Sequence, residues 1–176
     1  RAYQAFYEHM PLRASALTRS LEGLARGAEM RIYGQVAYGK LANLYLLDDR
    51  QYRDRQVCNK LGGYGSSFVD PDQCEEWLDP KRTLLGAQQE QWLNQGLLSS
   101  PRRWKLVAQS TQMSSSGVNT PLGRSAFTDG WDGYPQARAR LLGSVAQAGL
   151  KDVVVLGGDV HMNVAAQLRV QANDEK

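Results

Sequence analysis

The pattern of hydrophobic and polar positions predicts an α/β protein built from short strands and amphipathic helices. Residues 31–38 alternate between apolar and polar side chains, 42–47 form a short apolar run, and Gly39-Lys40 between them predicts a β-hairpin. A continuous apolar run over 152–156 is typical of a strand buried on both faces of its sheet. Further strands are predicted at 104–109 and 163–170.

Helical spacing of apolar residues appears in three segments. Residues 85–98 form the clearest amphipathic pattern, with leucines and a tryptophan near one face. Residues 134–148 predict a second helix that Gly149 caps, and residues 2–10 predict a third that Pro11 limits. Strands near the start, followed by strand–helix–strand units, indicate one α/β domain in which helices flank a sheet.

Two long polar segments, 54–82 and 111–132, lack either period and are predicted to be loops. Loops of this length within a compact domain are usually functional or cross-linked. The first contains Cys58 and Cys74, the only cysteines of the chain. They suit one disulfide in an oxidising compartment, or two free thiols in a cytosolic protein.

Composition narrows the class of protein. The 176 residues are 42% hydrophobic and 22% charged, as in one ordinary globular domain. The net charge of +3 is spread along the chain, which gives no case for nucleic-acid binding, and no apolar run is long enough to span a membrane. The chain starts at Arg1 without an initiator Met or a signal peptide, as a mature protein or the back half of a larger one would.

The sharpest chemical motif is Gly157-Gly158-Asp159-Val160-His161, which follows the apolar run at 152–156. Sites in open α/β sheets form beyond the carboxyl ends of strands. In extended backbone Asp159 and His161 would point to the same side, and a carboxylate beside an imidazole suits a metal ion. The glycines would let an ion or a phosphate approach the backbone. The alternative is an Asp that caps a turn beside a surface His.

A second motif, Asp48-Asp49-Arg50, follows the apolar run at 42–47. The carboxylates could bind a metal, and Arg50 could hold a phosphate through two parallel hydrogen bonds. The alternative is a strand-to-loop junction in which an Asp caps a turn and Arg50 makes a structural ion pair.

For three other residues the sequence favours a structural role or leaves one open. In the segment 128–135, Asp132 is predicted to cap the following helix and Trp131 to pack as an anchor. His9 is interpreted as a structural histidine or as part of the wall around a substrate. The serine-rich segments contain no G-x-S-x-G elbow, so a serine hydrolase is poorly supported.

Taken together and in order, the motifs resemble the alkaline phosphatase D (PhoD-like) family of metallophosphoesterases, which are related to the calcineurin-like and purple acid phosphatases. The matching segments are Tyr7–Arg13, Leu47–Arg53, Arg82–Gly86 with Gln88 and Trp92-Leu93, Asp129–Pro135, and Gly157–His161. The resemblance implies a sandwich of two mixed β-sheets flanked by helices, export to the periplasm or outside the cell, and hydrolysis of phosphate monoesters and diesters. Calcium and ferric iron are the implied metals.

The resemblance also implies roles for individual residues. Asp159 and His161 match the two ligands that flank one residue in the family, each binding a different metal. Arg50 or His9 would contact the phosphate, and the cysteine pair of the family matches Cys58 and Cys74.

The earlier motifs of the family are absent. A Gly-Asp pair and an Asp-Asp-His-Glu segment, which supply most metal ligands, would lie before Arg1. Residues 1–176 therefore resemble the C-terminal portion of one catalytic domain, and the N-terminal half, in the same or a separate chain, is an expected partner. The sequence thus predicts a metal-dependent phosphoesterase, incomplete as this chain alone. A non-catalytic phosphate- or carbohydrate-binding module on the same scaffold is the alternative.

Overall fold

The computed structural model describes residues 5, 8–10, 31–59, 68–121 and 123–171. The chain forms two compact units, residues 1–34 and residues 35–176. In the first unit the helical residues Ala5, Glu8 and His9 agree with the helix predicted at 2–10. Within the described residues, none of the helices has both the length and the apolar character needed to cross a membrane.

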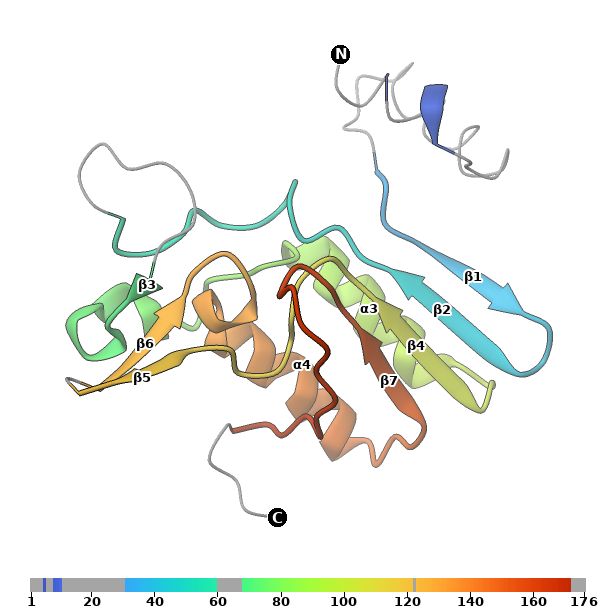
Figure 1. The fold of residues 1–176 in the computed structure, drawn as a ribbon. Helices are drawn as coiled ribbons and strands as arrows, with labels where there is room; N and C mark the ends of the chain where they lie inside the picture. The colour runs from blue at the N-terminus through green and yellow to red at the C-terminus, as the bar shows by residue number, and fades with distance from the viewer. Residues whose placement is uncertain (1–4, 6–7, 11–30, 60–67, 122, 172–176) are drawn as a thin grey trace. The chain divides into compact units, whose positions relative to one another are not determined.

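A four-stranded sheet in the order β1-β2-β4-β7 forms the frame of the second unit (Figure 1). Strands β2, β4 and β7 run parallel, whereas β1 runs in the opposite direction and forms the predicted hairpin with β2. The strands are β1 (Gly34–Tyr38), β2 (Ala42–Leu46), β4 (Trp104–Ala108) and β7 (Val153–Leu156). The parallel arrangement brings the carboxyl ends of three strands to the same edge.

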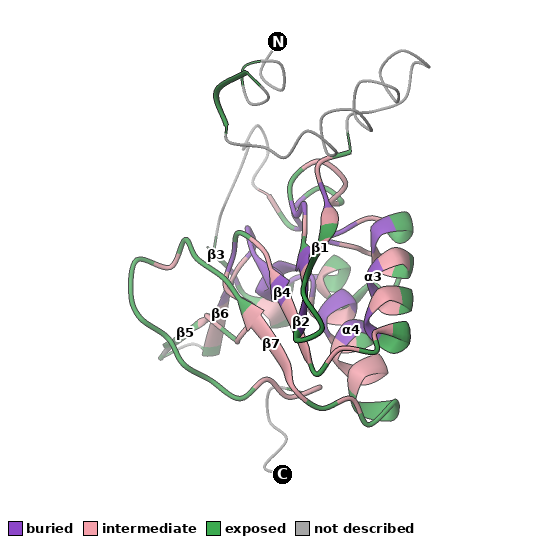
Figure 2. Cartoon of the chain, turned by 90° about the vertical axis from the view of Figure 1, so that its right-hand side faces the viewer, coloured by how far each residue is buried: buried purple, intermediate pink, exposed green. Residues whose placement is uncertain are grey.

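Helices α3 (Ala87–Ser99) and α4 (Pro135–Gln147) cover one face of this sheet, and their buried sides turn toward it (Figure 2). The core between them contains Tyr45 of β2 and Val107 of β4, packed with leucines of both helices. The ring of Tyr45 meets that of Trp92 edge-on at 5.9 Å, and its hydroxyl donates to the carbonyl of Gly96 at 2.5 Å. The sequence therefore predicted both helices correctly, and for α3 it also predicted the buried face.

Strand β7 is not buried on both faces, so that prediction is wrong. Among the described residues it lies at the edge of the sheet, beside β4 only. The side chains of Val153 to Val155 are half-buried, and Leu156 is 49% exposed. Ala108 of β4 pairs with Leu156 on one side and with Leu46 of β2 on the other, and Leu46 is 41% exposed. The helices cover the opposite face, and a continuous apolar run cannot distinguish such an edge strand from a central one.

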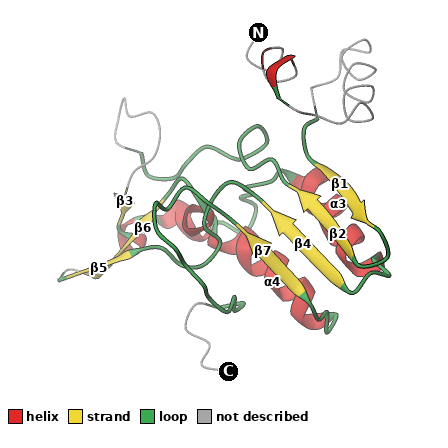
Figure 3. Cartoon of the chain, turned by 45° about the vertical axis from the view of Figure 1, so that its right-hand side comes forward, coloured by secondary structure: helices red, strands yellow, loops and turns green. Residues whose placement is uncertain are grey.

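The two predicted loops contain more structure than their sequences indicate. A small antiparallel sheet in the order β3-β6-β5 draws on both segments (Figure 3). Its strands are β3 (Phe68–Val69), β5 (Val118–Thr120) and β6 (Gly123–Phe127), and the short 3₁₀ helices are η1 (Pro71–Gln73), η2 (Glu75–Leu78) and η3 (Trp131–Gly133). The predicted strand at 163–170 is wrong, because this segment pairs with no other strand in the described part of the chain.

A disulfide joins Cys58 and Cys74, whose Cα atoms lie 6.0 Å apart, as the resemblance implied. It links the segment after β2 to the short helices η1 and η2. The indole of Trp77 in η2 donates to the carbonyl of Asp132 at 2.6 Å. The loop segments are thus held by strand pairing, by a disulfide and by side-chain hydrogen bonds.

Candidate active site at the carboxyl edge of the parallel strands

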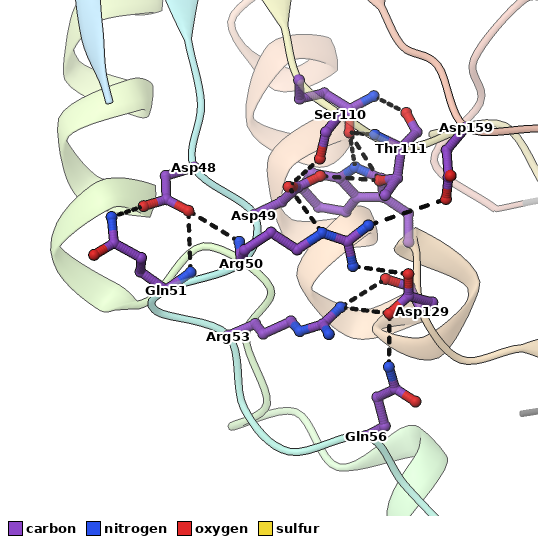
Figure 4. Close-up of polar contacts among 12 residues, drawn as sticks. Asp48, Asp49, Arg50, Gln51, Arg53, Gln56, Ser110, Thr111, Asp129 and Asp159 are labelled. Atoms are coloured by element: carbon purple, nitrogen blue, oxygen red, sulfur yellow. Dashed lines mark hydrogen bonds and ion pairs between the residues drawn. The ribbon is translucent and has the colours of Figure 1, made fainter. Parts of the chain in front are cut away.

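Three segments meet where the parallel strands end. Backbone pairing continues past the strands, since the amide of Leu47 donates to Ala108 at 2.9 Å and that of Gln109 donates to Leu156 at 3.1 Å. Asp48 to Arg53 therefore lie beside Ser110 and Thr111, and these lie beside the segment 157–161. Figure 4 shows the polar side chains that converge there.

Asp48 caps the turn after β2. One of its carboxylate oxygens accepts from the backbone amides of Arg50 and Gln51, both at 3.0 Å. The amide of Asp48 donates to the side chain of Gln89 in α3, and that side chain donates back to the carbonyl of Asp48, both at 2.8 Å. These contacts favour the turn-capping alternative for Asp48 and fix the backbone that presents Arg50.

Asp49 is buried with hydroxyl groups around it. The Ser110 hydroxyl donates to one carboxylate oxygen and the Thr111 hydroxyl to the other, the latter at 3.1 Å. The Nε of Arg50 lies 3.9 Å from the same carboxylate. Asp49 thus anchors the β4 loop to the β2 loop and places a negative charge behind Arg50.

Asp129, just after β6, joins two arginines and a glutamine. Its Oδ2 accepts from Arg50 Nη1 at 2.7 Å, and its Oδ1 accepts from Arg53 Nη1 at 2.8 Å and from Gln56 Nε2 at 2.7 Å. Burial raises the pKa of Asp129, but the hydrogen bonds and charges of the two arginines outweigh burial and lower that pKa. Asp129 is therefore an ionised carboxylate at neutral pH.

Arg50 is the exposed member of this cluster. Its side chain is 41% exposed, and Nη2 lies 4.0 Å from the carboxylate of Asp159, which is 50% exposed. Burial lowers the pKa of Arg50, but the hydrogen bond and charge of Asp129, with the charges of Asp49 and Asp159, raise it overall. Among the described residues, Nε and Nη2 make only these long ion-pair contacts, at 3.9 and 4.0 Å. This edge of the guanidinium has the geometry that binds an oxyanion through two hydrogen bonds.

The glycines before Asp159 allow close packing within the chain. A Cβ added to Gly157 would collide with the backbone carbonyl of Thr111, and one added to Gly158 would lie 3.6 Å from the carbonyl of Ser110. The space gained by omitting a side chain at Gly157 is therefore filled by the loop after β4. An ion or phosphate approaching this glycine, as the sequence suggested, is not needed to explain it.

The backbone at Asp159 and His161 is not extended, contrary to the basis on which the sequence analysis placed the two side chains on one side. Both have positive φ angles, 72° and 57°, a left-handed conformation that is uncommon for residues other than glycine. Both nevertheless line one open cavity of about 1360 Å³, whose other walls include apolar side chains of α4 and β7. Both residues are exposed, and they line the same cavity from a left-handed rather than an extended backbone.

The described residues fit only part of a metal site. Within them, no cluster of three or more His, Cys, Asp or Glu side chains has the geometry to hold a metal ion. A carboxylate oxygen and an imidazole nitrogen are suitable donors, but two ligands do not close the shell of four to eight that zinc or calcium takes. Asp159 and His161 could therefore contribute to a metal site but not complete one.

The remaining sequence predictions have separate outcomes. Trp131 is a buried anchor, as predicted, and its indole donates to Gln109 Oε1 at 3.2 Å. Asp132 does not cap α4, because its carboxylate accepts from the amide of Ser116 at 2.9 Å and from Arg124 at 2.8 Å. His9 is exposed in the first unit, and its contact with phosphate stays a prediction.

Sequence reasoning missed Arg53, Gln56 and Asp129 as members of the site. Arg53 and Asp129 lie within the segments Leu47–Arg53 and Asp129–Pro135, whereas Gln56 lies in the predicted loop 54–82. Along the chain Asp129 is 76 residues from Arg53, 73 from Gln56 and 79 from Arg50. Asp129 was grouped with a helix-capping segment. Only the recurrence of an Asp and two arginines in segments that follow strands could have indicated the cluster.

Comparisons with known proteins identify the family and the fold. The family model described as PhoD-like phosphatase matches residues 1–176. Alkaline phosphatase D of Bacillus subtilis (strain 168) is 41% identical over 169 residues, which are 96% of this chain and 26% of that protein. A solved structure of PhoD aligns with 91% of this chain and 28% of its own length, with a TM-score of 0.74 and 41% identity.

The chain spans about a quarter of the length of these relatives. The structural match confirms the predicted α/β class and the metallophosphoesterase-like fold. With the whole chain matched by the family model and the motifs at the carboxyl edge in place, this chain belongs to the PhoD-like phosphatase family.

Proposed function

We propose that this chain forms part of the active site of a metal-dependent phosphoesterase that hydrolyses phosphate monoesters and diesters. The observation that carries the proposal is the exposed edge of Arg50, held 4.0 Å from Asp159 at the carboxyl ends of the parallel strands. Membership of the PhoD-like family and the name of the Bacillus relative, alkaline phosphatase D, support the reaction class.

In this proposal Arg50 binds the phosphoryl group. Its Nε and Nη2 would donate two parallel hydrogen bonds to phosphate oxygens, while Nη1 stays on Asp129 at 2.7 Å. A fixed guanidinium beside the reacting group stabilises the negative charge that grows on the phosphoryl oxygens, because no donor has to reorient during the reaction.

Asp159 and His161 are the proposed metal ligands of this chain. Bound metal would supply positive charge to the phosphoryl oxygens and activate water for attack. The family resemblance implies calcium and ferric iron, and a carboxylate and an imidazole are donors that these metals accept. His161 is exposed and on the cavity side, so it is also within the region that a phosphate ester would occupy.

The remaining ligands are proposed to come from the N-terminal half of the same domain, with residues 1–176 as its C-terminal portion. We therefore expect the isolated 176-residue chain to show no measurable turnover of p-nitrophenyl phosphate, because two ligands do not retain a metal. Assays of the purified chain, with added calcium and ferric iron, check this. Robust turnover by the chain alone would overturn the assignment of most ligands to another segment.

An extracytoplasmic location is also part of the proposal. The Cys58–Cys74 disulfide is typical of proteins that fold in an oxidising compartment, such as the periplasm or the extracellular space. Fractionation of cells that express the intact protein tests the location, and a purely cytosolic, reduced protein would contradict it.

Substitution of the proposed ligands tests the site. In the intact natural protein that contains these residues, His161→Ala is expected to lower metal affinity 10-fold or more. Loss of a residue that merely hydrogen-bonds to a metal ligand already lowers affinity by that factor. Asp159→Asn should weaken metal binding as well, because an amide oxygen carries no net charge. The measurements are metal content by elemental analysis, the rate of phosphate release, and a thermal melt.

The matched control is Asp152→Asn, at the opposite end of β7. Asp152 also has a positive φ angle, 57°, and pairs with Arg103 at 3.3 Å. It lines the same cavity, but the length of β7 separates it from Asp159. It should keep wild-type metal content and rate.

If both site variants also keep full metal and full rate, the segment 157–161 is only a turn. A folded wild-type protein that binds phosphate without metal or turnover would favour the alternative of a non-catalytic binding module.

A further inference from the structure

We propose that Asp129 is a positioning residue that holds Arg50 in the orientation that binds phosphate; this rests on the proposed function of the site. Asp129 itself lies beneath Arg50 in the cluster, and only 12% of its side chain is exposed. It contacts the guanidinium at the single nitrogen, Nη1, that is turned away from Asp159 (Figure 4).

The two oxygens of Asp129 have divided roles. Oδ1 accepts from both Arg53 and Gln56, whereas Oδ2 accepts from Arg50. Arg53 Nη1 also donates to the backbone carbonyl of Asp129 at 3.0 Å. Two hydrogen bonds on one oxygen and a third on the carbonyl fix the plane of the carboxylate, so the direction of Oδ2 is set before Arg50 binds to it.

Gln56 is itself held by a buried residue of the segment after β6. The hydroxyl of Thr128, which is fully buried, donates to Gln56 Oε1 at 3.0 Å. The side-chain amide of Gln56 must therefore direct its Nε2 toward Asp129. A chain of contacts thus runs from Thr128 through Gln56 and Asp129 to Arg50, and links the β6 loop to the loop after β2.

Such support matters because a half-exposed arginine is otherwise free to adopt many rotamers. Ordering an arginine side chain costs conformational entropy. With Nη1 held by an ionised carboxylate, much of that cost is met when the protein folds rather than when phosphate binds. Displacements of about 1 Å in a positioning group can lower a rate about 100-fold.

Asparagine at position 129 removes this support with little change in volume. Its amide has one oxygen in place of two, so it cannot accept from Arg53 and Gln56 on one side and from Arg50 on the other. Its NH₂ group would instead face one set of donors. Arg50 should then lose its fixed direction while remaining in the protein.

The test is a double-mutant cycle on Arg50→Ala and Asp129→Asn in the intact natural protein. We expect Asp129→Asn to lower kcat/KM for p-nitrophenyl phosphate about 10- to 100-fold. In the Arg50→Ala background the same change should cost less than about 2-fold, because residues that act through one another are not additive. The affinity for inorganic phosphate, measured by calorimetry, should follow the same pattern.

The outcomes separate the two proposals. An equal loss in both backgrounds, or no loss in the wild-type background, overturns the positioning role even when Arg50→Ala impairs turnover. Absent turnover in the folded, metal-containing wild-type protein overturns the proposed function instead, and the phosphate-binding cycle then still decides the role of Asp129. Asp152→Asn serves as the control for loss of an ion pair elsewhere.

A variant with the same charge covers the case in which Asp129→Asn does not fold. Asp129→Glu keeps the carboxylate but moves it by one methylene group. It should retain a melting temperature close to that of the wild type and an intermediate kcat/KM, with the loss again absent in the Arg50→Ala background. A loss that persists without Arg50 would contradict the proposal.

Discussion

Replacing Arg50 with alanine in the intact protein is expected to lower kcat for phosphate-ester hydrolysis about 10²- to 10³-fold, the scale of losing one preorganised charge-stabilising donor. The reason is the position of the exposed Nε–Nη2 edge, whose Nη2 lies 4.0 Å from Asp159 on the side of the proposed metal ligands. Stopped or continuous assays with p-nitrophenyl phosphate at saturating substrate measure the change in kcat directly.

Arg50→Lys is the matched variant for this prediction. A lysine keeps the charge but cannot bond to Asp129 and to two phosphate oxygens at once, because it presents one nitrogen in place of three. It should recover less than half of the lost free energy of activation. A wild-type kcat in Arg50→Ala, with unchanged metal content, would show that Arg50 makes only a structural ion pair with Asp129.

Removing the disulfide is expected to lower the free energy of unfolding by about 3 kcal/mol, the chain-entropy value for a closed loop of about 15 residues. Cys58 and Cys74 are separated by 16 positions, and the loop that they close directly follows the segment that carries Arg53 and Gln56. The double variant Cys58→Ala/Cys74→Ala should therefore unfold at a lower urea concentration than the oxidised wild type.

Reduction provides the control for this second prediction. Dithiothreitol should move the unfolding midpoint of the wild type toward that of the double variant and leave the double variant unchanged. Equal midpoints for the oxidised wild type and the double variant would contradict a stabilising role. Titration of the unfolded, unreduced 176-residue chain should detect no free thiol, since its two cysteines are paired.

Local periodicity accounts for what the sequence predicted correctly. The helices α3 and α4 bury one face against the sheet, and β2 buries Tyr45 beneath them, so their apolar spacing is visible within a single segment. The hairpin of β1 and β2 was indicated by its alternating residues and by Gly39-Lys40 between them. The pair β5 and β6 has no such face. Its strands are rich in Gly, Ser, Asn and Arg, and they are held by pairing with each other and with β3.

The site was predictable only in part for the same reason. Asp159 and Arg50 each follow an apolar strand, and parallel strands bring such ends together, so both could be selected from the sequence. Asp129 follows a strand that the sequence did not reveal, and it reaches Arg50 across 79 residues. Its neighbour Asp132 was assigned a local cap, whereas the folded chain uses that carboxylate to bind Ser116 and Arg124.

The most direct test of the account is hydrolysis of p-nitrophenyl phosphate and bis(p-nitrophenyl) phosphate by the intact protein, purified with its metal retained. The comparison is with the double variant Arg50→Ala/His161→Ala, which removes the proposed phosphate contact and one proposed metal ligand. We predict turnover of at least one ester by the wild type and a rate at least 10³-fold lower in a double variant that melts normally, since each change alone costs on the order of 10- to 1000-fold. A folded, metal-containing wild type that hydrolyses neither ester, or a double variant with the wild-type rate, would contradict a phosphoesterase site at the carboxyl edge of β2, β4 and β7.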